Sequence, residues 1–163
     1  MPVTSVFKNR NFLGLIVANT ILGTAFPIQL ILGGLAGLML APSPTLVTLP
    51  SSVQTLAALL AAAPSSLLMG RFGRRVGFVV GGVLTLVGAG AAIQALLAQN
   101  FVLLCAAHFL MGAGWAAFQY FRFAAGEVVA AKLRPVAISL MLSSLLVAAI
   151  VGPQLFIAAK DAL

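Results

Sequence analysis

Five long apolar runs with hardly any charge inside them constrain this chain more than any other feature. They cover residues 12–40, 46–69, 76–97, 101–125 and 135–159. The hydrocarbon core of a bilayer is about 30 Å thick, and roughly 20 helical residues cross it. An α-helix pairs its backbone polar groups within one segment, as hydrocarbon requires. The sequence therefore predicts an all-α membrane protein, a bundle of about five transmembrane helices.

Composition supports a lipid environment for most of the chain. Hydrophobic residues make up 62% of the 163 residues, charged residues make up 7%, and the mean hydropathy is +1.17. A soluble domain is roughly 25% charged, so this chain could not cover a water-exposed surface. The first run is longer than the apolar region of a signal peptide, which has about 7–15 residues. We therefore expect this run to remain as the first membrane helix.

The charged residues lie in short clusters between the apolar runs and predict an orientation. The clusters are Lys8 and Arg10; Arg71, Arg74 and Arg75; and Lys132 and Arg134. If each run crosses the membrane, these clusters share one side, while the connections at 41–45 and 99–100 carry no charge. On that second side only Lys160 and Asp161 are charged. Basic connections stay cytoplasmic, which predicts a multi-pass protein of the cell membrane with a cytoplasmic N-terminus.

The same inventory of side chains disfavours other classes of protein. The net charge of +7 is spread over connections rather than over one face of a soluble fold, so a nucleic-acid partner is not expected. One histidine, one cysteine and two acidic residues cannot build a hydrolytic triad or a metal cluster. We therefore expect neither an enzyme nor a bound metal or cofactor.

Polar residues in the fourth run fall on one side of a predicted helix. His108, Trp115, Gln119 and Arg122 lie within a stripe roughly 80° wide at about 100° per residue. Polar groups in a membrane turn away from lipid, toward a cavity or a partner helix. His108 is thus a candidate for proton coupling or for hydrogen bonding to a substrate. A neutral histidine bonded to a neighbouring helix is an equally good interpretation.

The remaining candidates for cavity lining are aromatic or amide side chains. Trp115 could stack on a planar substrate, although packing is the better account of a single tryptophan. Asn19, Gln29 and Gln54 are candidates in the first two runs, beside Gln119 in the fourth. Gln29 follows Pro27, whose ring removes one backbone hydrogen bond from its helix. These neutral groups suit a small, weakly charged or planar organic compound better than a multiply charged ion.

Glycines at small-xxx-small spacing predict close contacts between helices. Gly33 and Gly37 form one such pair, and Gly77 and Gly81 form another. Without side chains at these positions two helix backbones can approach closely. We interpret both pairs as packing surfaces rather than as ligand sites.

The connection after the second run carries a short basic motif. It reads Arg71-x-Gly73-Arg74-Arg75. This resembles the signature loop of the major facilitator superfamily, Gly-x-x-x-Asp-Arg-x-Gly-Arg-Arg. Gly70 stands at the position of the family's Asp. A simple positive-inside anchor would account for the arginines too.

Two further runs resemble motifs of the same family. In the fourth, His108 stands at the arginine of Arg-x-x-x-Gly-x-Gly, and Gly112 matches the first glycine. In the fifth, Gly152-Pro153 resembles the end of Gly-x-x-x-Gly-Pro, with Ala148 at the earlier glycine. The three motifs occur in the family's order, and the resemblance covers essentially the whole chain.

This resemblance implies a fold and a function. Residues 1–163 would form an incomplete N-terminal helical domain of the family's fold, whose two six-helix halves enclose a substrate site at mid-membrane. The implied function is secondary active transport of a small organic solute by alternating access, with the chain as a fragment of a larger transporter. Its partners would be the lipid bilayer, the solute, and a second half-transporter or a second copy.

One alternative belongs to a different class of function. The chain could be a non-transporting membrane interaction or assembly subunit, or an inactive truncated product. Such a subunit would use its glycine faces for helix pairing and would need no cavity. A flux assay separates these possibilities.

Overall fold

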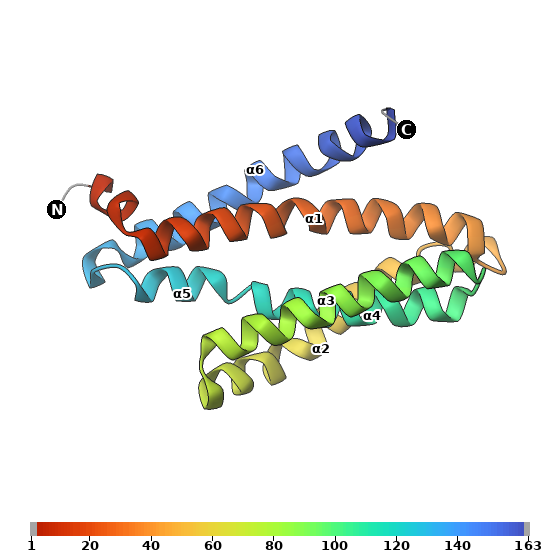
Figure 1. Cartoon of the computed structure of the whole chain (residues 1–163), viewed down its shortest axis with the longest axis horizontal. Helices are drawn as coiled ribbons and strands as arrows, with labels where there is room; N and C mark the ends of the chain where they lie inside the picture. Colours follow the sequence, from red (N-terminus) through yellow and green to blue (C-terminus); the bar gives the residue numbers. More distant parts are fainter. Residues whose placement is uncertain (1–2, 162–163) are drawn as a thin grey trace. The chain divides into compact units, whose positions relative to one another are not determined.

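The computed structural model describes residues 3–161, and their side chains over 6–158. The elements in chain order are η1 (Val3–Lys8), α1 (Arg10–Leu40), η2 (Pro44–Leu46), α2 (Leu49–Phe72), α3 (Arg74–Leu97), α4 (Phe101–Phe118), α5 (Phe121–Glu127), η3 (Ala131–Leu133) and α6 (Arg134–Asp161) (Figure 1). The predicted all-α fold is confirmed for this part of the chain. Lys160 and Asp161 lie outside the residues whose side chains are described.

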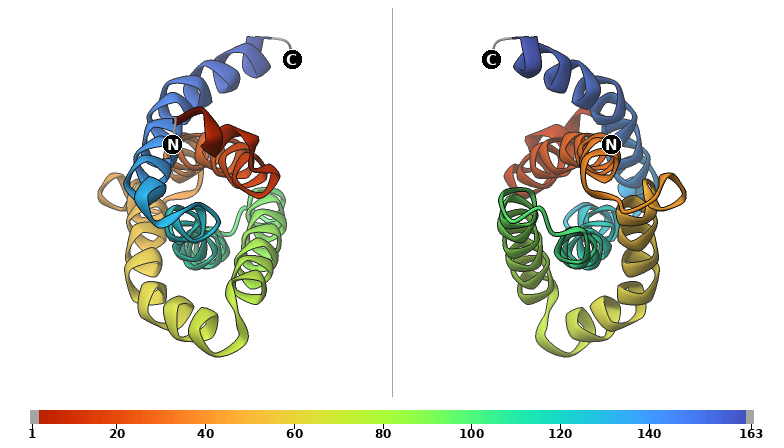
Figure 2. Two further views of the ribbon diagram at one scale, coloured as in Figure 1. Left: turned by 90° about the vertical axis from the view of Figure 1, so that its left-hand side faces the viewer. Right: turned by 90° about the vertical axis from the view of Figure 1, so that its right-hand side faces the viewer.

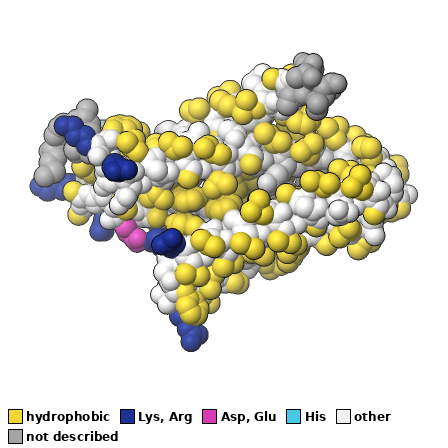
Figure 3. Space-filling model, in the orientation of Figure 1, with side chains coloured by type: hydrophobic (Ala, Val, Ile, Leu, Met, Phe, Trp, Pro, Cys, Tyr) yellow, Lys and Arg dark blue, Asp and Glu magenta, His cyan; other side chains and the backbone are white. Residues whose placement is uncertain are grey.

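Five helical segments of the described chain are long and apolar enough to cross a membrane. They are Arg10–Leu40, Pro44–Phe72, Arg74–Leu97, Phe101–Glu127 and Ala131–Ala158. They match the five predicted runs to within a few residues. Figure 3 shows apolar side chains over the visible flanks of the helices and basic side chains near helix ends. Flanks of this kind suit contact with lipid rather than with water.

The fourth segment differs from its prediction as a single helix. Gln119 and Tyr120 form a turn that ends α4 and precedes α5. The backbone N–H groups of Phe123 and Ala124 both donate to the Tyr120 carbonyl, each at 3.1 Å. The predicted polar stripe assumed 100° per residue up to Arg122, and the turn breaks that regular rotation. The stripe therefore ends at Gln119.

The chain divides into two compact units. Unit 1 consists of Met1–Gln29 with Tyr120–Leu163, and unit 2 is Leu30–Gln119. In unit 2, α4 lies between α2 and α3, as Figure 2 shows, and it packs far more extensively against each of them than they pack against each other. Half of the most apolar window of Phe101–Glu127 is buried, against 11% to 22% for the other four segments. The polar residues of α4 thus belong to the most enclosed segment.

Glycines set the spacing between α3 and α4 in unit 2. A Cβ built on Gly81 would lie 2.6 Å from the Ala117 Cβ and 3.0 Å from the Gly114 carbonyl oxygen. Gly77 instead faces the side chain of Met69, which belongs to α2. The predicted close approach of two helix backbones is therefore confirmed at Gly81, whereas Gly77 makes room for a side chain of α2.

Unit 1 is held together by contacts between the start of the chain and α6. A Cβ on Gly23 would lie 2.9 Å from the Ala148 Cβ, and one on Gly152 would lie 2.7 Å from the Thr24 carbonyl oxygen and 2.9 Å from Pro27 Cγ. Gly23 on α1 and the small pair Ala148 and Gly152 on α6 thus let the two helices touch along about one turn.

Asn9 closes the other end of unit 1. Its Oδ1 accepts hydrogen bonds from the backbone N–H groups of Asn11 (3.0 Å) and Phe12 (3.3 Å), which makes it the N-cap of α1. Its Nδ2 donates to the Val128 carbonyl in the connection between α5 and η3. One side chain therefore ties the start of α1 to a segment far along the chain.

A left-handed residue joins α3 to α4. Gln99 has a φ of 50°. The Asn100 N–H donates to the Ala95 carbonyl at 2.9 Å, and the Gln99 N–H donates to the Leu96 carbonyl at 3.3 Å. This pair of bonds is a Schellman motif, which glycine usually completes. Asn100 then caps α4, because its Oδ1 accepts the Leu103 N–H at 2.9 Å.

Candidate functional site

His108 lies in the interior of unit 2, among residues of three helices. Its side chain is only 3% exposed, and its Nδ1 is 2.9 Å from the Leu104 carbonyl of its own helix. A Cβ built on Gly33 of α1 would lie 2.5 Å from His108 Nε2 and 3.0 Å from Ser51 Oγ of α2. Any side chain at Gly33 would thus overlap the imidazole of His108. An enclosed imidazole next to a hydroxyl can exchange hydrogen bonds or take up a proton.

One helical turn away, Gln54 adds an amide to the same interior. The Gln54 side chain is fully buried. A Cβ on Gly112 would collide with the Gln54 backbone carbonyl and would lie 3.0 Å from the Ala57 Cβ. Because Gly112 follows His108 by four residues on α4, Gln54 and His108 lie on neighbouring turns of the contact between α2 and α4. The structure therefore brings the predicted residues His108 and Gln54 onto neighbouring turns. We call His108, Gln54 and Ser51 together the α4 polar layer.

Two predicted residues lie farther along the chain, Trp115 within α4 and Gln119 directly after its last residue. Trp115 and Gln119 are both half-buried. The Trp115 ring meets the Phe118 ring edge to face, with centroids 6.4 Å apart. Gln119 is the last residue of unit 2, and its backbone N–H donates to the Trp115 carbonyl at 3.3 Å. An indole face and an amide one turn apart can hold a flat ring and bond its polar edge.

Asn19 belongs to unit 1 and not to the α4 polar layer. Its side chain is 6% exposed, and Nδ2 donates to the Met141 carbonyl at 3.0 Å and to Ser144 Oγ at 2.8 Å. Ser144 donates in turn to the Met141 carbonyl at 2.8 Å. Asn19 therefore joins α1 to α6 by side-chain hydrogen bonds.

Gln29 and Arg122 are also in unit 1, and both are half-buried. Gln29 follows Pro27 within α1. The guanidinium carbon of Arg122 lies 5.1 Å from the centroid of the Phe123 ring. The contact between a cation and an aromatic face accounts for part of the environment of Arg122.

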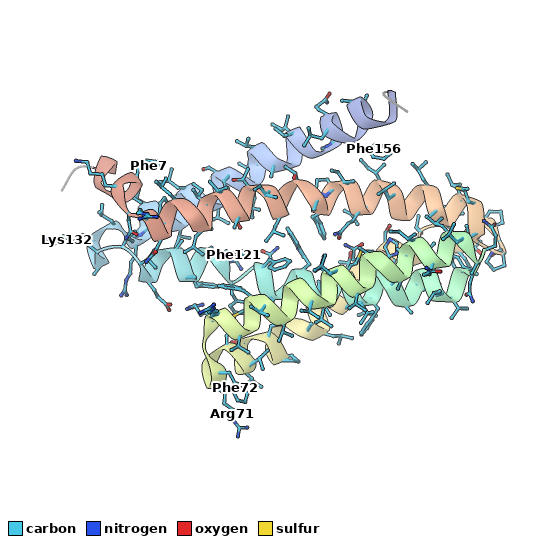
Figure 4. The ribbon with its side chains drawn as sticks, viewed as in Figure 1. Phe7, Arg71, Phe72, Phe121, Lys132 and Phe156 are labelled. Carbon is cyan, nitrogen blue, oxygen red and sulfur yellow. The ribbon has the colours of Figure 1, made fainter. Side chains whose placement is uncertain are left out.

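The basic motif forms the turn between α2 and α3. Gly73 has φ 88° and ψ 157°, a conformation essentially restricted to glycine. Arg71 stacks on Phe72 at 5.4 Å, and Figure 4 shows both side chains pointing away from the helices. Arg71 suits the negative end of the α2 dipole, whereas Arg74 and Arg75 begin α3, where the dipole disfavours cations. Helix stability therefore does not explain these last two arginines.

Sequence reasoning missed two hydroxyls. Ser51 lies beside His108 and Gly33, and Ser144 accepts the Asn19 amide. The sequence could have indicated Ser51, because it lies three residues before Gln54 and so on the same side of a helix. For Ser144 the sequence carries no sign of a partner on α1, because packing between distant segments decides that contact.

Comparison with known proteins adds an independent observation. Over 155 residues, 37% are identical to the riboflavin transporter RfnT of Brucella anthropi. This chain resembles a transporter. The matched region is 93% of this chain but only 38% of RfnT, so the chain spans well under half the length of that relative. No family model and no solved structure matches.

The similarity to RfnT and the helices agree on the class of protein. Five segments of the described chain can cross a bilayer by length and composition, and RfnT is a transporter by name. The chain is therefore a multi-pass integral membrane protein. The α4 polar layer, with Trp115 and Gln119, is its candidate functional site.

Proposed function

We propose that this chain forms part of a secondary transporter of the major facilitator type, which moves a small planar organic solute by alternating access. The similarity to RfnT over nearly the whole chain carries the proposal. The three partial motifs, which resemble those of the major facilitator superfamily, supply the family in this proposal. Riboflavin is the first solute to test, because it is the solute named for RfnT.

The side chains of α4 suit such a solute. Riboflavin has a flat three-ring system whose one edge carries alternating hydrogen-bond donors and acceptors. An aromatic face such as Trp115 offers stacking, and an amide such as Gln119 can both donate and accept at that edge. Neither residue carries a charge, which fits a neutral ring.

His108 is our candidate for coupling transport to protons. Imidazole is the side chain whose ordinary pKa lies closest to neutral pH, and His108 is enclosed among α1, α2 and α4 of unit 2. Protonation would place a charge in a membrane interior, which is costly unless a carboxylate or a water-filled path compensates it. Opening the site to one side would supply that water.

A hybrid transporter tests the proposed function. In the hybrid, this chain replaces the matching segment of RfnT, and a bacterial strain that cannot make riboflavin takes up labelled riboflavin. We expect uptake by the hybrid. Trp115→Ala should reduce uptake by about 10-fold or more, because base or ring stacking contributes roughly 1–3 kcal/mol per contact. Val102→Ala, at an exposed apolar position of α4, serves as the matched control.

The outcomes separate the transport hypothesis from its alternative. A hybrid that inserts into the membrane at RfnT levels but takes up no riboflavin and no other flavin would contradict the substrate assignment. If the chain instead binds RfnT segments without restoring any flux, the non-transporting assembly subunit becomes the better account.

His108→Gln should flatten the dependence of uptake on pH between about pH 5 and pH 8 while leaving riboflavin binding in place.

A further inference from the structure

We propose that the end of unit 1 formed by η1 and η3 is a binding surface for the headgroups of anionic phospholipids. Four basic residues lie there, from two segments far apart in the sequence: Lys8, Arg10, Lys132 and Arg134. All four side chains are exposed. Figure 3 shows basic atoms at this end, besides others elsewhere on the same face, and Figure 4 shows Lys132 and Phe7 there.

Hydrogen bonding and burial hold this surface in a fixed arrangement. Asn9 lies between Lys8 and Arg10 and donates to the Val128 carbonyl, which precedes η3. Val6 and Leu133, beside the basic residues, are buried at 1% and 9% exposure. The two basic segments are therefore tied together rather than carried on loose connections. A fixed array of cations loses less conformational entropy when it binds an anion.

The charges at this end are poorly compensated by the protein itself. Within the described residues no ion pair involves any of the four basic side chains, and the acidic residue at this end is Glu127. Four positive charges against one negative charge leave a formal charge of +3. Arg10 and Arg134 are also the first residues of α1 and α6, where the helix dipole disfavours a cation. A phosphate group at this end would offset both effects.

An exposed aromatic residue points to a lipid rather than to a dissolved anion. Phe7 is 43% exposed beside Lys8, and its ring meets the Phe12 ring edge to face with centroids 6.1 Å apart. A basic residue next to an exposed ring is typical of segments that lie at the level of the headgroups. The proposal is independent of which solute the chain transports.

Lipid binding by the purified full chain tests the surface. Native mass spectrometry would count bound phosphatidylglycerol and phosphatidylcholine for the wild type and for the double variant Lys8→Gln with Lys132→Gln. We expect phosphatidylglycerol affinity to fall on the order of 10-fold, with no change for phosphatidylcholine. The matched control is Arg71→Gln with Arg75→Gln, which removes the same charge from exposed residues of unit 2.

A charge-preserving variant guards against a change in folding or insertion. Lys8→Arg with Lys132→Arg should bind phosphatidylglycerol as the wild type does. Equal losses in the Lys8/Lys132 and Arg71/Arg75 variants would overturn the proposal, because net charge alone would then explain binding. Displacement of bound lipid by millimolar inorganic phosphate would overturn the assignment to lipid.

Discussion

At the scale of single residues, Gly112 determines how closely α4 can approach α2. The Gln54 carbonyl occupies the space that a side chain at this position would need. The same approach brings His108 and Gln54 onto neighbouring turns, so the α4 polar layer depends on a residue that has no polar side chain. Gly33 has the same relation to the His108 ring.

Gly112→Ala should therefore destabilise unit 2, although alanine is the better helix former. We expect the free energy of unfolding to fall by about 1–3 kcal/mol, the usual effect of overpacking. The control is Gly90→Ala on α3, where a Cβ would meet no atom within 4 Å. This change should stabilise the protein by up to about 1 kcal/mol. Thermal unfolding in detergent measures both, and equal effects would contradict the packing argument.

At the scale of elements, hydrogen bonds inside the membrane fix α1 against α6. The Asn19 amide reaches both the Met141 carbonyl and the Ser144 hydroxyl, and small residues above it let the helices touch. An amide that faced lipid would lose its hydrogen bonds to water without replacement. Its partners on α6 supply that replacement.

A double-mutant cycle tests this link. Asn19→Ala and Ser144→Ala should each destabilise unit 1, and the double variant should cost less than the two single losses added. We expect a coupling energy of about 0.6 kcal/mol and at most roughly 1.7 kcal/mol, as for other side-chain hydrogen bonds in membranes. Ser143→Ala, at the adjacent exposed position, should change stability by less than about 0.5 kcal/mol. If the two single losses of stability simply added in the double variant, the proposed link between Asn19 and Ser144 would be contradicted.

Helices were predictable from the sequence because each depends on its own segment. Apolar length located the five segments of the described chain that are able to cross a membrane, and clusters such as Arg71 to Arg75 marked where two of them end or begin. The turn at Gln119 and Tyr120 was not predictable, since neither proline nor glycine marks it. Within the site, the interior position of His108 was predicted from its polarity. Its neighbours Gly33 and Ser51 were not, because packing between distant segments decides them.

At the scale of the whole molecule, connections with and without basic residues alternate along the chain. This alternation predicts which connections face the cytoplasm. A single cysteine at Thr45 and one at Phe72, each in a Cys105→Ala background, can be labelled with a membrane-impermeant maleimide. We expect Thr45→Cys to react in intact cells and Phe72→Cys to react only after permeabilisation, because arginine-rich turns stay cytoplasmic. Ala98→Cys should behave like Thr45→Cys. Labelling of Thr45→Cys and Phe72→Cys from the same side would contradict the proposed orientation.

The discontinuous make-up of unit 1 has a consequence for biosynthesis. All of unit 2 is synthesised before Tyr120. The hydrogen-bond partners of unit 1 come later, because the carbonyl that accepts from Asn9 lies 119 positions after it and Ser144 lies 125 positions after Asn19. At about 5–20 residues per second, the ribosome needs on the order of ten seconds to deliver those partners. The first part of α1 thus spends this interval in the nascent protein with its final contacts still unmade, and it is the stretch on which an insertion chaperone would act.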